Sequence, residues 1–322
     1  MAAALRFRSG IIGRMRVALM LLPLLLVASG VSVRAQSGPG TLEGTWDFAT
    51  LTPLERPAEF AGRATITDAE AAAWASQNME RNSRDRRDGG AAVDVARAVN
   101  DYWFDRGTAL APRNGQRMTS LVTDPADGRL PPLTAQAQAR LAAGAADNRA
   151  HPADGPENRS LQERCLSFNA GPPMLPGPYN NMVRIHEMPG YVVIYNEMIH
   201  DARIIPLDSR PRPPATVRRW QGESRGRWEG RTLVIETTHF TSNVNVRGGD
   251  AQLRLVERLT RVDDRTLEYE FTVDNPTAYT RPWTAVLPMQ RTDDPMFEYA
   301  CHEGNHALED ILRGARYQER NR

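Results

Sequence analysis

Ionisable side chains cluster where the chain reads EMIHDARIIPLD, at residues 197–208. His200, Asp201 and Arg203 fall at a bend between two predicted strands. A histidine beside a carboxylate can be held in one tautomer with a raised pKa. An arginine nearby can hold an anion or a developing oxyanion. These three residues are therefore candidate catalytic residues for acid–base chemistry, although a structural salt-bridge cluster at a turn would use the same residue types.

A second polar cluster, CHEGNH, occupies residues 301–306 and contributes His302 and Glu303 as catalytic candidates on the opposite side of a pocket. If Cys165 and Cys301 form a disulfide, the segment 164–181 lies beside this cluster. Its Gly, Pro and amide residues favour a rigid loop that faces a ligand. The candidate ligand-binding residues of this loop are Tyr179, Asn180 and Asn181.

Other candidates are polar residues that interrupt apolar strand faces, since alternate residues of a strand share a face. Glu257 falls among leucines, and a buried carboxylate is costly unless it is paired. We therefore expect Glu257 to meet an Arg or His inside, or to face a wet cavity. A purely structural ion pair, a histidine at the rim and a helix-capping Glu303 are the alternatives. The remaining candidate ligand-binding residues are Asn196, Trp220, His239 and Glu257.

The elements that must position these residues have a period of two from about residue 180 onwards, which is typical of β-strands. A hairpin is predicted around Pro189-Gly190. Eight short strands with no helix between them predict a mainly β fold, a closed antiparallel barrel or a sandwich, with flanking helices. The predicted strands are 182–188, 191–198, 202–207, 232–240, 253–262, 266–273, 283–289 and 297–303.

The segment 36–160 is predicted to supply a first strand and a helical or loop region that packs on the β core of 161–322. Thr67 followed by Glu70 predicts a capping box for a helix over 67–83. Thr134 is a plausible N-cap of the next helix. Asn305 is expected to cap a C-terminal helix over 305–316.

The first 35 residues resemble a secretory signal peptide, with a basic start, an apolar run over 17–30 and small residues before a cut after Ala35. This predicts a periplasmic or secreted protein without membrane association after cleavage. The cut removes five arginines and changes the formal charge from +1 to 1 − 5 = −4. That charge argues against nucleic-acid binding.

The residue types that are missing exclude several mechanisms. The sequence contains no lysine, which excludes a Schiff-base lysine and a P-loop lysine. It also lacks the nucleophile-elbow, H-E-x-x-H and dinucleotide-loop motifs, so we expect no cofactor and no metal. Two cysteines in an exported chain favour the disulfide Cys165–Cys301. The alternative to the disulfide is that the two thiols are zinc ligands. A separate alternative is a zinc site built from His200, Asp201, His302, Glu303 or His306.

Several strings resemble a broad family of exported bacterial proteins, among them AGPPMLPGPYNN, YVVIYNEMIHDARIIPLD, SRGRWEG, LRLVERLTRVD and FEYACHEGN. The resemblance implies that these blocks belong to one domain, and it carries no catalytic assignment. Gly44 and Trp46 form the G-x-W pattern at the start of lipocalin-like barrels, which host carriers of apolar ligands and a few hydratases and cyclases.

We therefore expect an exported enzyme that applies His and carboxylate acid–base chemistry to a small, partly apolar substrate, in a lyase, hydratase, isomerase or hydrolase step. The alternative is a non-catalytic, lipocalin-like binding protein for a small apolar or aromatic ligand. A third hypothesis is a structural protein of the cell envelope.

Overall fold

The computed structural model describes residues 41–97, 99–168, 171–244 and 246–321. These residues belong to one compact unit. The predicted signal peptide and its cut after Ala35 lie outside the described residues. No helix among the described residues is long and apolar enough to cross a membrane.

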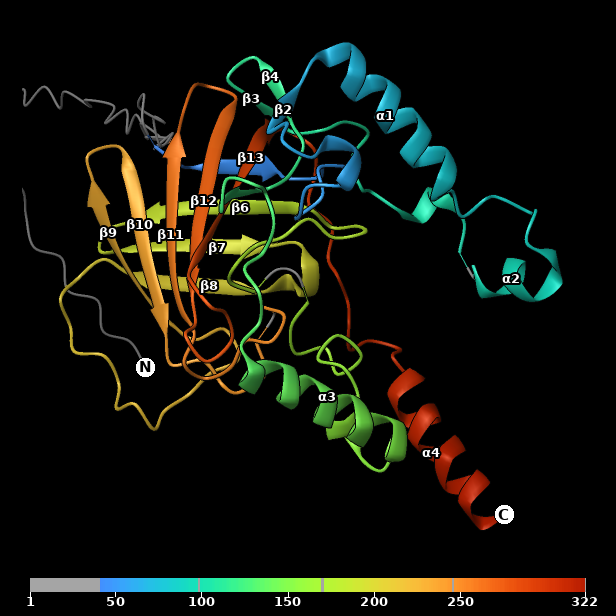
Figure 1. Cartoon of the computed structure of the whole chain (residues 1–322). Helices are drawn as coiled ribbons and strands as arrows, with labels where there is room; N and C mark the ends of the chain where they lie inside the picture. Colours follow the sequence, from blue (N-terminus) through green and yellow to red (C-terminus); the bar gives the residue numbers. More distant parts are fainter. Residues whose placement is uncertain (1–40, 98, 169–170, 245, 322) are drawn as a thin grey trace, which may run out of the picture. The chain divides into compact units, whose positions relative to one another are not determined.

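A large antiparallel sheet dominates the described chain, together with four α-helices, so the fold is mixed α/β (Figure 1). Its strand order is β8-β7-β6-β1-β13-β12-β11-β10-β9, and β5 also pairs with β13. The strands are β1 (Gly44–Asp47), β5 (Val122–Asp124), β6 (Met182–Met188), β7 (Tyr191–Asn196), β8 (Ala202–Pro206), β9 (Glu223–Glu229), β10 (Thr232–Thr238), β11 (Arg254–Arg261), β12 (Thr266–Asp274) and β13 (Trp283–Thr292).

Local sequence accounts for the hairpins of this sheet. The predicted hairpin at Pro189-Gly190 is confirmed as β6–β7, and Gly190 takes the left-handed backbone conformation with φ +79° that glycine adopts without strain. Along β12, buried and half-buried residues alternate from end to end. The inward residues Tyr269 and Phe271 of β12 pack with Trp283 of β13 in the main core.

The predicted antiparallel architecture is confirmed, but the closed barrel is wrong for the described residues. The edge strands β8 and β9 lie side by side without backbone pairing. A Cβ on Gly226 of β9 would lie 2.8 Å from a methyl of Leu207 and 3.0 Å from one of Ile205. Side chains of β8 and of the residue that follows it therefore pack against the backbone of β9, and edge-to-edge pairing does not form. We call this junction the seam.

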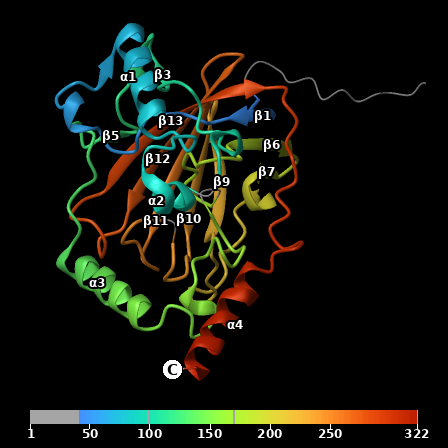
Figure 2. The same ribbon diagram turned by 90° about the vertical axis from the view of Figure 1, so that its right-hand side faces the viewer.

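The N-terminal part contributes two strands to the main sheet and forms a small second sheet. β1 lies between β6 and β13, and its Trp46 is fully buried. The small sheet has the order β2-β4-β3, from β2 (Thr65–Ile66), β4 (Gln116–Met118) and β3 (Pro112–Arg113). The helices are α1 (Asp68–Arg81), α2 (Gly90–Ala96), α3 (Ala135–Ala150) and α4 (Ala307–Arg320), and Figure 2 shows α3 and α4 on the same side of the sheet.

The predicted helix caps are largely confirmed. Thr67 and Glu70 form the capping box of α1, and the Thr134 hydroxyl accepts a hydrogen bond from Ala137 N–H at 3.1 Å. The prediction for Asn305 is wrong, because α4 begins at Ala307 and its N-cap is His306; the side chain of Asn305 only accepts a local hydrogen bond from Ala307 N–H at 3.2 Å.

The strand predicted at 297–303 is wrong, and β9 was not among the predicted strands. The segment 293–306 contains no strand. Its alternating residues serve other contacts, because Tyr299 stacks on Tyr179 and Cys301 forms a disulfide. β9 lacks the alternating apolar pattern of a strand, because it is polar and its last three residues are exposed.

Candidate functional site

The seam holds a pocket of about 340 Å³ that is lined by several of the predicted site residues. Asp201 immediately precedes β8 and Arg203 lies within it, so their side chains share a face two residues apart. Opposite them stand Trp220, Gln221, Glu223 and Ser224, at the start of β9. We call this cavity the seam pocket. It is within the size range of small-molecule sites.

A buried ion pair forms the inner wall of the seam pocket. Both terminal nitrogens of Arg203 donate to Glu257 of β11, at 3.0 and 2.7 Å, and neither side chain is more than 3% exposed. The Tyr269 hydroxyl donates to the same carboxylate at 2.8 Å, and it accepts from Met174 N–H at 3.1 Å. The expectation that Glu257 meets an arginine inside is confirmed.

Two hydroxyls complete this network on the side of β9 and β10. Arg203 donates to Ser224 at 3.1 Å and to Thr237 at 3.4 Å, and these two hydroxyls lie 3.0 Å apart. Burial alone would lower the pKa of Arg203, but the attraction and hydrogen bonds of Glu257 reverse this and raise the pKa. Burial also raises the pKa of Tyr269 well above its ordinary value. The Arg203 guanidinium therefore stays charged and the Tyr269 hydroxyl stays neutral in the physiological range.

Asp201 is the titratable group of the seam pocket with a pKa close to neutral. Burial raises its pKa to about 6, while the charges of His200 and Arg203 pull it down. Gln221 donates a hydrogen bond to its carboxylate. A carboxyl with this pKa exchanges its proton near neutral pH, which suits a general acid or base.

His200 lies beside Asp201 but makes its hydrogen bond elsewhere. It is exposed, its backbone is left-handed with φ +45°, and its Nδ1 lies 2.9 Å from the Tyr299 carbonyl oxygen. A carbonyl accepts only, so Nδ1 carries a proton and donates it to this hydrogen bond. The tautomer is thus fixed by a backbone carbonyl rather than by the predicted carboxylate.

The outer wall of the seam pocket combines an aromatic ring with charges. Trp220 is half-buried, and the guanidinium of Arg164 lies 5.9 Å from the centre of its ring. Glu223 is almost buried and is held by Arg219 at 3.0 Å and by Arg225. Because Glu223 is paired twice, Asp201 is the less constrained carboxyl of the two.

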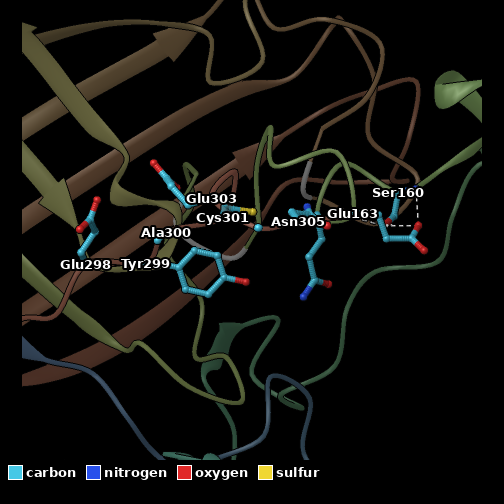
Figure 3. A pocket seen from close by; sticks show the side chains of 10 residues that line it. Ser160, Glu163, Glu298, Tyr299, Ala300, Cys301, Glu303 and Asn305 are labelled. Atoms are coloured by element: carbon cyan, nitrogen blue, oxygen red, sulfur yellow. Dashed lines mark hydrogen bonds between the residues drawn. The ribbon is translucent and has the colours of Figure 1, made fainter. Parts of the chain in front are cut away.

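The second predicted cluster lies in a different cavity. An open pocket of about 800 Å³ is lined by Glu163, Tyr299, Glu303 and Asn305, and Figure 3 shows these side chains around the Cys301 segment. His302 is exposed and lines neither this pocket nor the seam pocket. The sequence predicted that His302 and Glu303 face Asp201 and Arg203 across one cavity. This prediction is wrong, because the two clusters lie in different places.

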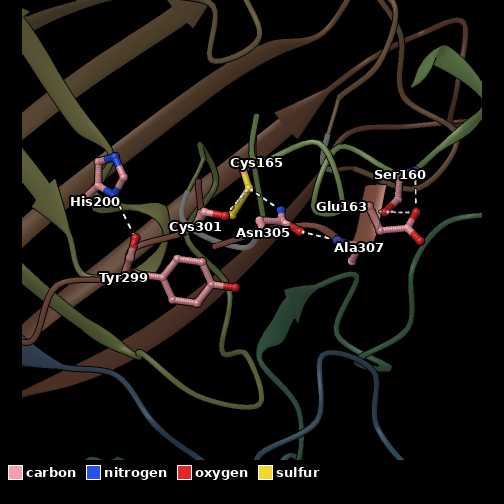
Figure 4. The surroundings of a disulfide bond; sticks show 8 residues. All are labelled: Ser160, Glu163, Cys165, His200, Tyr299, Cys301, Asn305 and Ala307. Carbon is pink, nitrogen blue, oxygen red and sulfur yellow. Dashed lines mark hydrogen bonds between the residues drawn. A yellow bond between two sulfur atoms is a disulfide. The ribbon is translucent and has the colours of Figure 1, made fainter. Parts of the chain in front are cut away.

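The predicted disulfide Cys165–Cys301 is confirmed, and it joins residues 136 apart in the sequence (Figure 4). Asn305 donates to the Cys165 sulfur at 3.4 Å, and His200 bonds to Tyr299 two residues before Cys301. Leu166, next to Cys165, lines the seam pocket. The disulfide thus fixes segments that border both cavities.

The loop candidates 179–181 have structural contacts. Tyr179 stacks on Tyr299 with ring centres 6.3 Å apart. Asn180 bonds to Glu197, whose pKa is raised by burial. Asn181 is buried, donates to the carbonyls of Asp105 and Gly177 and accepts from Gly177 N–H at 2.7 Å. None of the three lines the seam pocket.

His239 departs from the strand face predicted for it, whereas Asn196 lies where the strand alternation places it. β10 ends at Thr238, and His239 has a left-handed backbone with φ +60°, so the alternation that placed it on an apolar face stops before it. Its Nδ1 lies 2.8 Å from the Thr238 hydroxyl. Asn196 is buried on the apolar face as predicted, and neither its side-chain oxygen nor its nitrogen has a hydrogen-bond partner.

Among the described residues, no group of three or more His, Cys, Asp or Glu side chains is placed to hold a metal ion. Both cysteines are in the disulfide, so neither offers a thiolate.

Sequence reasoning missed Gln221, Glu223 and Ser224 as lining residues of the seam pocket. They follow Trp220 directly, so the flagged aromatic residue marked the right segment. What no local pattern supplies is the approach of β9 to β8.

Comparisons with protein-family models, curated proteins and solved structures give no match for this chain, so the site is interpreted from its own geometry.

Proposed function

We propose that the protein is an exported enzyme that carries out acid–base chemistry on a small, partly apolar substrate in the seam pocket. Asp201 is the proton donor or acceptor. Trp220 and Leu166 provide apolar surface, and the Arg203–Glu257 pair holds the inner wall rigid. The reaction class is proton transfer at a small molecule, as in a lyase, hydratase, isomerase or hydrolase step.

The observation that carries this proposal is the position of Asp201. Its half-buried carboxyl, with a pKa of about 6, lines a pocket together with a buried arginine. A group that titrates near the working pH is available both as acid and as base.

The first test is native mass spectrometry of the protein after export to a periplasm, because it weighs any bound organic molecule directly. The bound molecule is then incubated with wild type, Asp201→Asn and Trp220→Ala. Asp201→Asn is expected to keep the ligand and lose its conversion, since the amide preserves the shape and removes the titrating proton. Trp220→Ala is expected to lose the ligand.

The second candidate function is a non-catalytic binding protein, and one observation favours it. Asp201 accepts a hydrogen bond from Gln221, and Glu223 forms ion pairs with two arginines. Most of the polar lining is thus satisfied by other protein groups, as in a recognition surface. A ligand that binds wild type and Asp201→Asn equally, and that neither protein converts, would favour this function.

We also propose that the protein works in the periplasm or outside the cell, as we expect of the exported bacterial proteins that it resembles. The disulfide supports an oxidising compartment. Mass spectrometry of the mature protein tests this directly, because the mass expected after cleavage at Ala35 is two protons lower when both cysteines are joined.

A further inference from the structure

Asn196 is a buried amide without a visible structural reason. It ends β7 on the face that carries Val192 and Ile194, which are fully buried. Its own exposure is 1%, and both polar atoms of its side chain lack a hydrogen-bond partner. Leaving a buried polar group unpaired costs its full desolvation. An aliphatic residue would fill this position without that cost.

The strand register places Asn196 opposite Asp201, which lines the seam pocket. Tyr195 is paired with Ala202, and Asn196 N–H donates to the Asp201 carbonyl at 2.8 Å. Residues opposite each other in an antiparallel pair have their side chains on one face. Asn196 therefore neighbours Asp201, and it is diagonal to Arg203. Asp201 and Arg203 both line the seam pocket.

Arg203 brings a second buried group without a partner to the same face. Its terminal nitrogens donate to Glu257, Ser224 and Thr237, but its Nε has no acceptor. Together with the Asn196 amide, this makes three N–H bonds and one carbonyl oxygen that are unpaired on neighbouring positions. The excess is of donors, so the missing partner is a group rich in acceptors.

We propose that Asn196 and the Nε of Arg203 form a subsite at the seam pocket for the carboxylate of a small acid. One carboxylate oxygen accepts from Asn196 Nδ2 and the other from Arg203 Nε. The apolar remainder of the acid lies on Trp220. This inference rests on the proposed use of the seam pocket as the substrate site, and it deepens that proposal by naming the substrate class.

The charges around the subsite couple carboxylate binding to the protonation of Asp201. Arg203 is neutralised by Glu257, and Glu223 is neutralised by Arg219 and Arg225. The other charged or titratable neighbours are Arg164 beside Trp220, His200 and Asp201. A carboxylate repels ionised Asp201 and accepts a hydrogen bond from protonated Asp201. Binding is therefore coupled to proton uptake by Asp201, and affinity falls by up to about tenfold per pH unit above pH 6.

Benzoate is the probe, with benzamide as its neutral analogue, and isothermal titration from pH 5.5 to 7.5 is the measurement. We expect saturable binding of benzoate that weakens at least tenfold over this range, whereas binding of benzamide changes little. In buffers of different ionisation heat, benzoate is expected to take up about one proton per site at pH 7. Absence of benzoate binding by wild type, or a pH-independent affinity, would overturn the inference.

Asn196→Leu and Asn181→Leu are the matched variants, because both replace a buried asparagine by a side chain of similar size. Asn181→Leu is expected to lower the unfolding temperature, since it breaks three hydrogen bonds to the backbone. Asn196→Leu is expected to weaken benzoate binding at least tenfold without lowering that temperature. Asn196→Ala is the second variant, in case the leucine is too bulky to fold.

The outcomes separate this inference from the function that it rests on. If Trp220→Ala removes benzoate binding and the Asn196 variants do not, the subsite is wrong and the seam pocket stands. If Asn196→Leu lowers the unfolding temperature as Asn181→Leu does, Asn196 is a structural residue held by internal water, and the inference is overturned. A neutral co-purifying molecule converted through Asp201 would support the enzyme and contradict the acid.

Discussion

At the scale of single residues, the Arg203–Glu257 pair is the strongest constraint on the interior. A buried ion pair contributes little to stability compared with well-packed apolar residues, but loss of one partner leaves an unpaired charge. We predict that Glu257→Gln lowers the free energy of unfolding by about 3–5 kcal/mol, since Arg203 then keeps its charge in a site that is almost dry. Urea unfolding at pH 7 measures the change.

The double variant Arg203→Met with Glu257→Leu is the control for this prediction. It removes both charges, and it is expected to recover most of the lost stability. A cost below about 1 kcal/mol for Glu257→Gln would mean that the charge of Arg203 is compensated without Glu257, and would contradict the ion pair as the main stabilisation of that charge.

Asp201 has the opposite relation to stability. Its pKa in the folded protein is about 6, above the ordinary value of 3.8. The folded state therefore binds this proton more tightly than the unfolded state does. Ionisation of Asp201 costs nothing below about pH 4, and its cost grows between pH 4 and 6 and is complete above pH 6. We predict that Asp201→Asn matches wild type near pH 4 and is about 1 kcal/mol more stable at pH 8, because the half-buried carboxyl is partly screened.

Thermal unfolding of wild type and Asp201→Asn across pH 4–8 checks this sign. Asp293→Asn is the matched control, because Asp293 is exposed. A stability difference that stays constant with pH would show that the substitution at Asp201 acts through packing rather than through the proton.

Residue patterns predicted some of the site and failed where backbone geometry intervened. Glu257 was identified because it breaks an apolar stripe, and a stripe is a local signal. Its partner was named only as a class, since Arg203 lies 54 residues away. The apolar strand face is wrong for His239, because strand alternation does not continue through its left-handed backbone, and the alternative of a histidine at the strand end fits instead.

At the scale of elements, the seam depends on the absence of a side chain at Gly226. A Cβ there would meet Leu207 and Ile205 of the neighbouring chain segment within 3.0 Å. We predict that Gly226→Ala costs about 1–3 kcal/mol through overpacking. It is also expected to weaken ligand binding in the seam pocket, because β8 and β9 must move apart. Urea unfolding and titration of the ligand measure the two effects.

Gly144→Ala in α3 is the matched control for Gly226→Ala, because nothing lies within 4 Å of its added methyl. There the substitution is expected to stabilise by about 0.5–1 kcal/mol, as usual for glycine in a helix. If Gly226→Ala behaved like Gly144→Ala, the close packing of β8 on β9 would be contradicted.

Elements formed by local signals were predictable and those formed by distant contacts were not. Pro189-Gly190 fixes its own hairpin, and Thr67 with Glu70 fixes its own helix start. The segment 297–303 has the alternation of a strand, yet it needs a free sheet edge, and it finds contacts with Tyr179 and Cys165 instead. The closure of the sheet, too, was assumed from strand count, whereas the packing at Gly226 decides it.

At the scale of the whole molecule, the disulfide joins the site to the C-terminal segment. Cys165 lies between Arg164, which stacks over Trp220, and Leu166, which lines the seam pocket. Near Cys301, the Tyr299 carbonyl orients the ring of His200. A long covalent link of this kind stabilises mainly by restricting the unfolded chain. Its local effect is on the few loop contacts that hold the two segments, because the sheet hydrogen bonds do not depend on it.

We therefore predict that the double variant Cys165→Ser/Cys301→Ser unfolds with a free energy lower by about 2–5 kcal/mol but retains the sheet. In hydrogen exchange measured by mass spectrometry, residues 160–168 and 297–306 are expected to lose protection, while β10–β12 keep it up to global unfolding. Reductant should reproduce this pattern in wild type and leave the double variant unchanged. Loss of protection in β10–β12 at the same rate would instead mean that the sheet and the disulfide segments open as one cooperative unit. Leu166 and the Tyr299 carbonyl belong to the segments that loosen. Ligand affinity in the seam pocket should therefore fall as these segments lose protection from exchange. The oxidising compartment would then be a requirement of the site as well as of the fold.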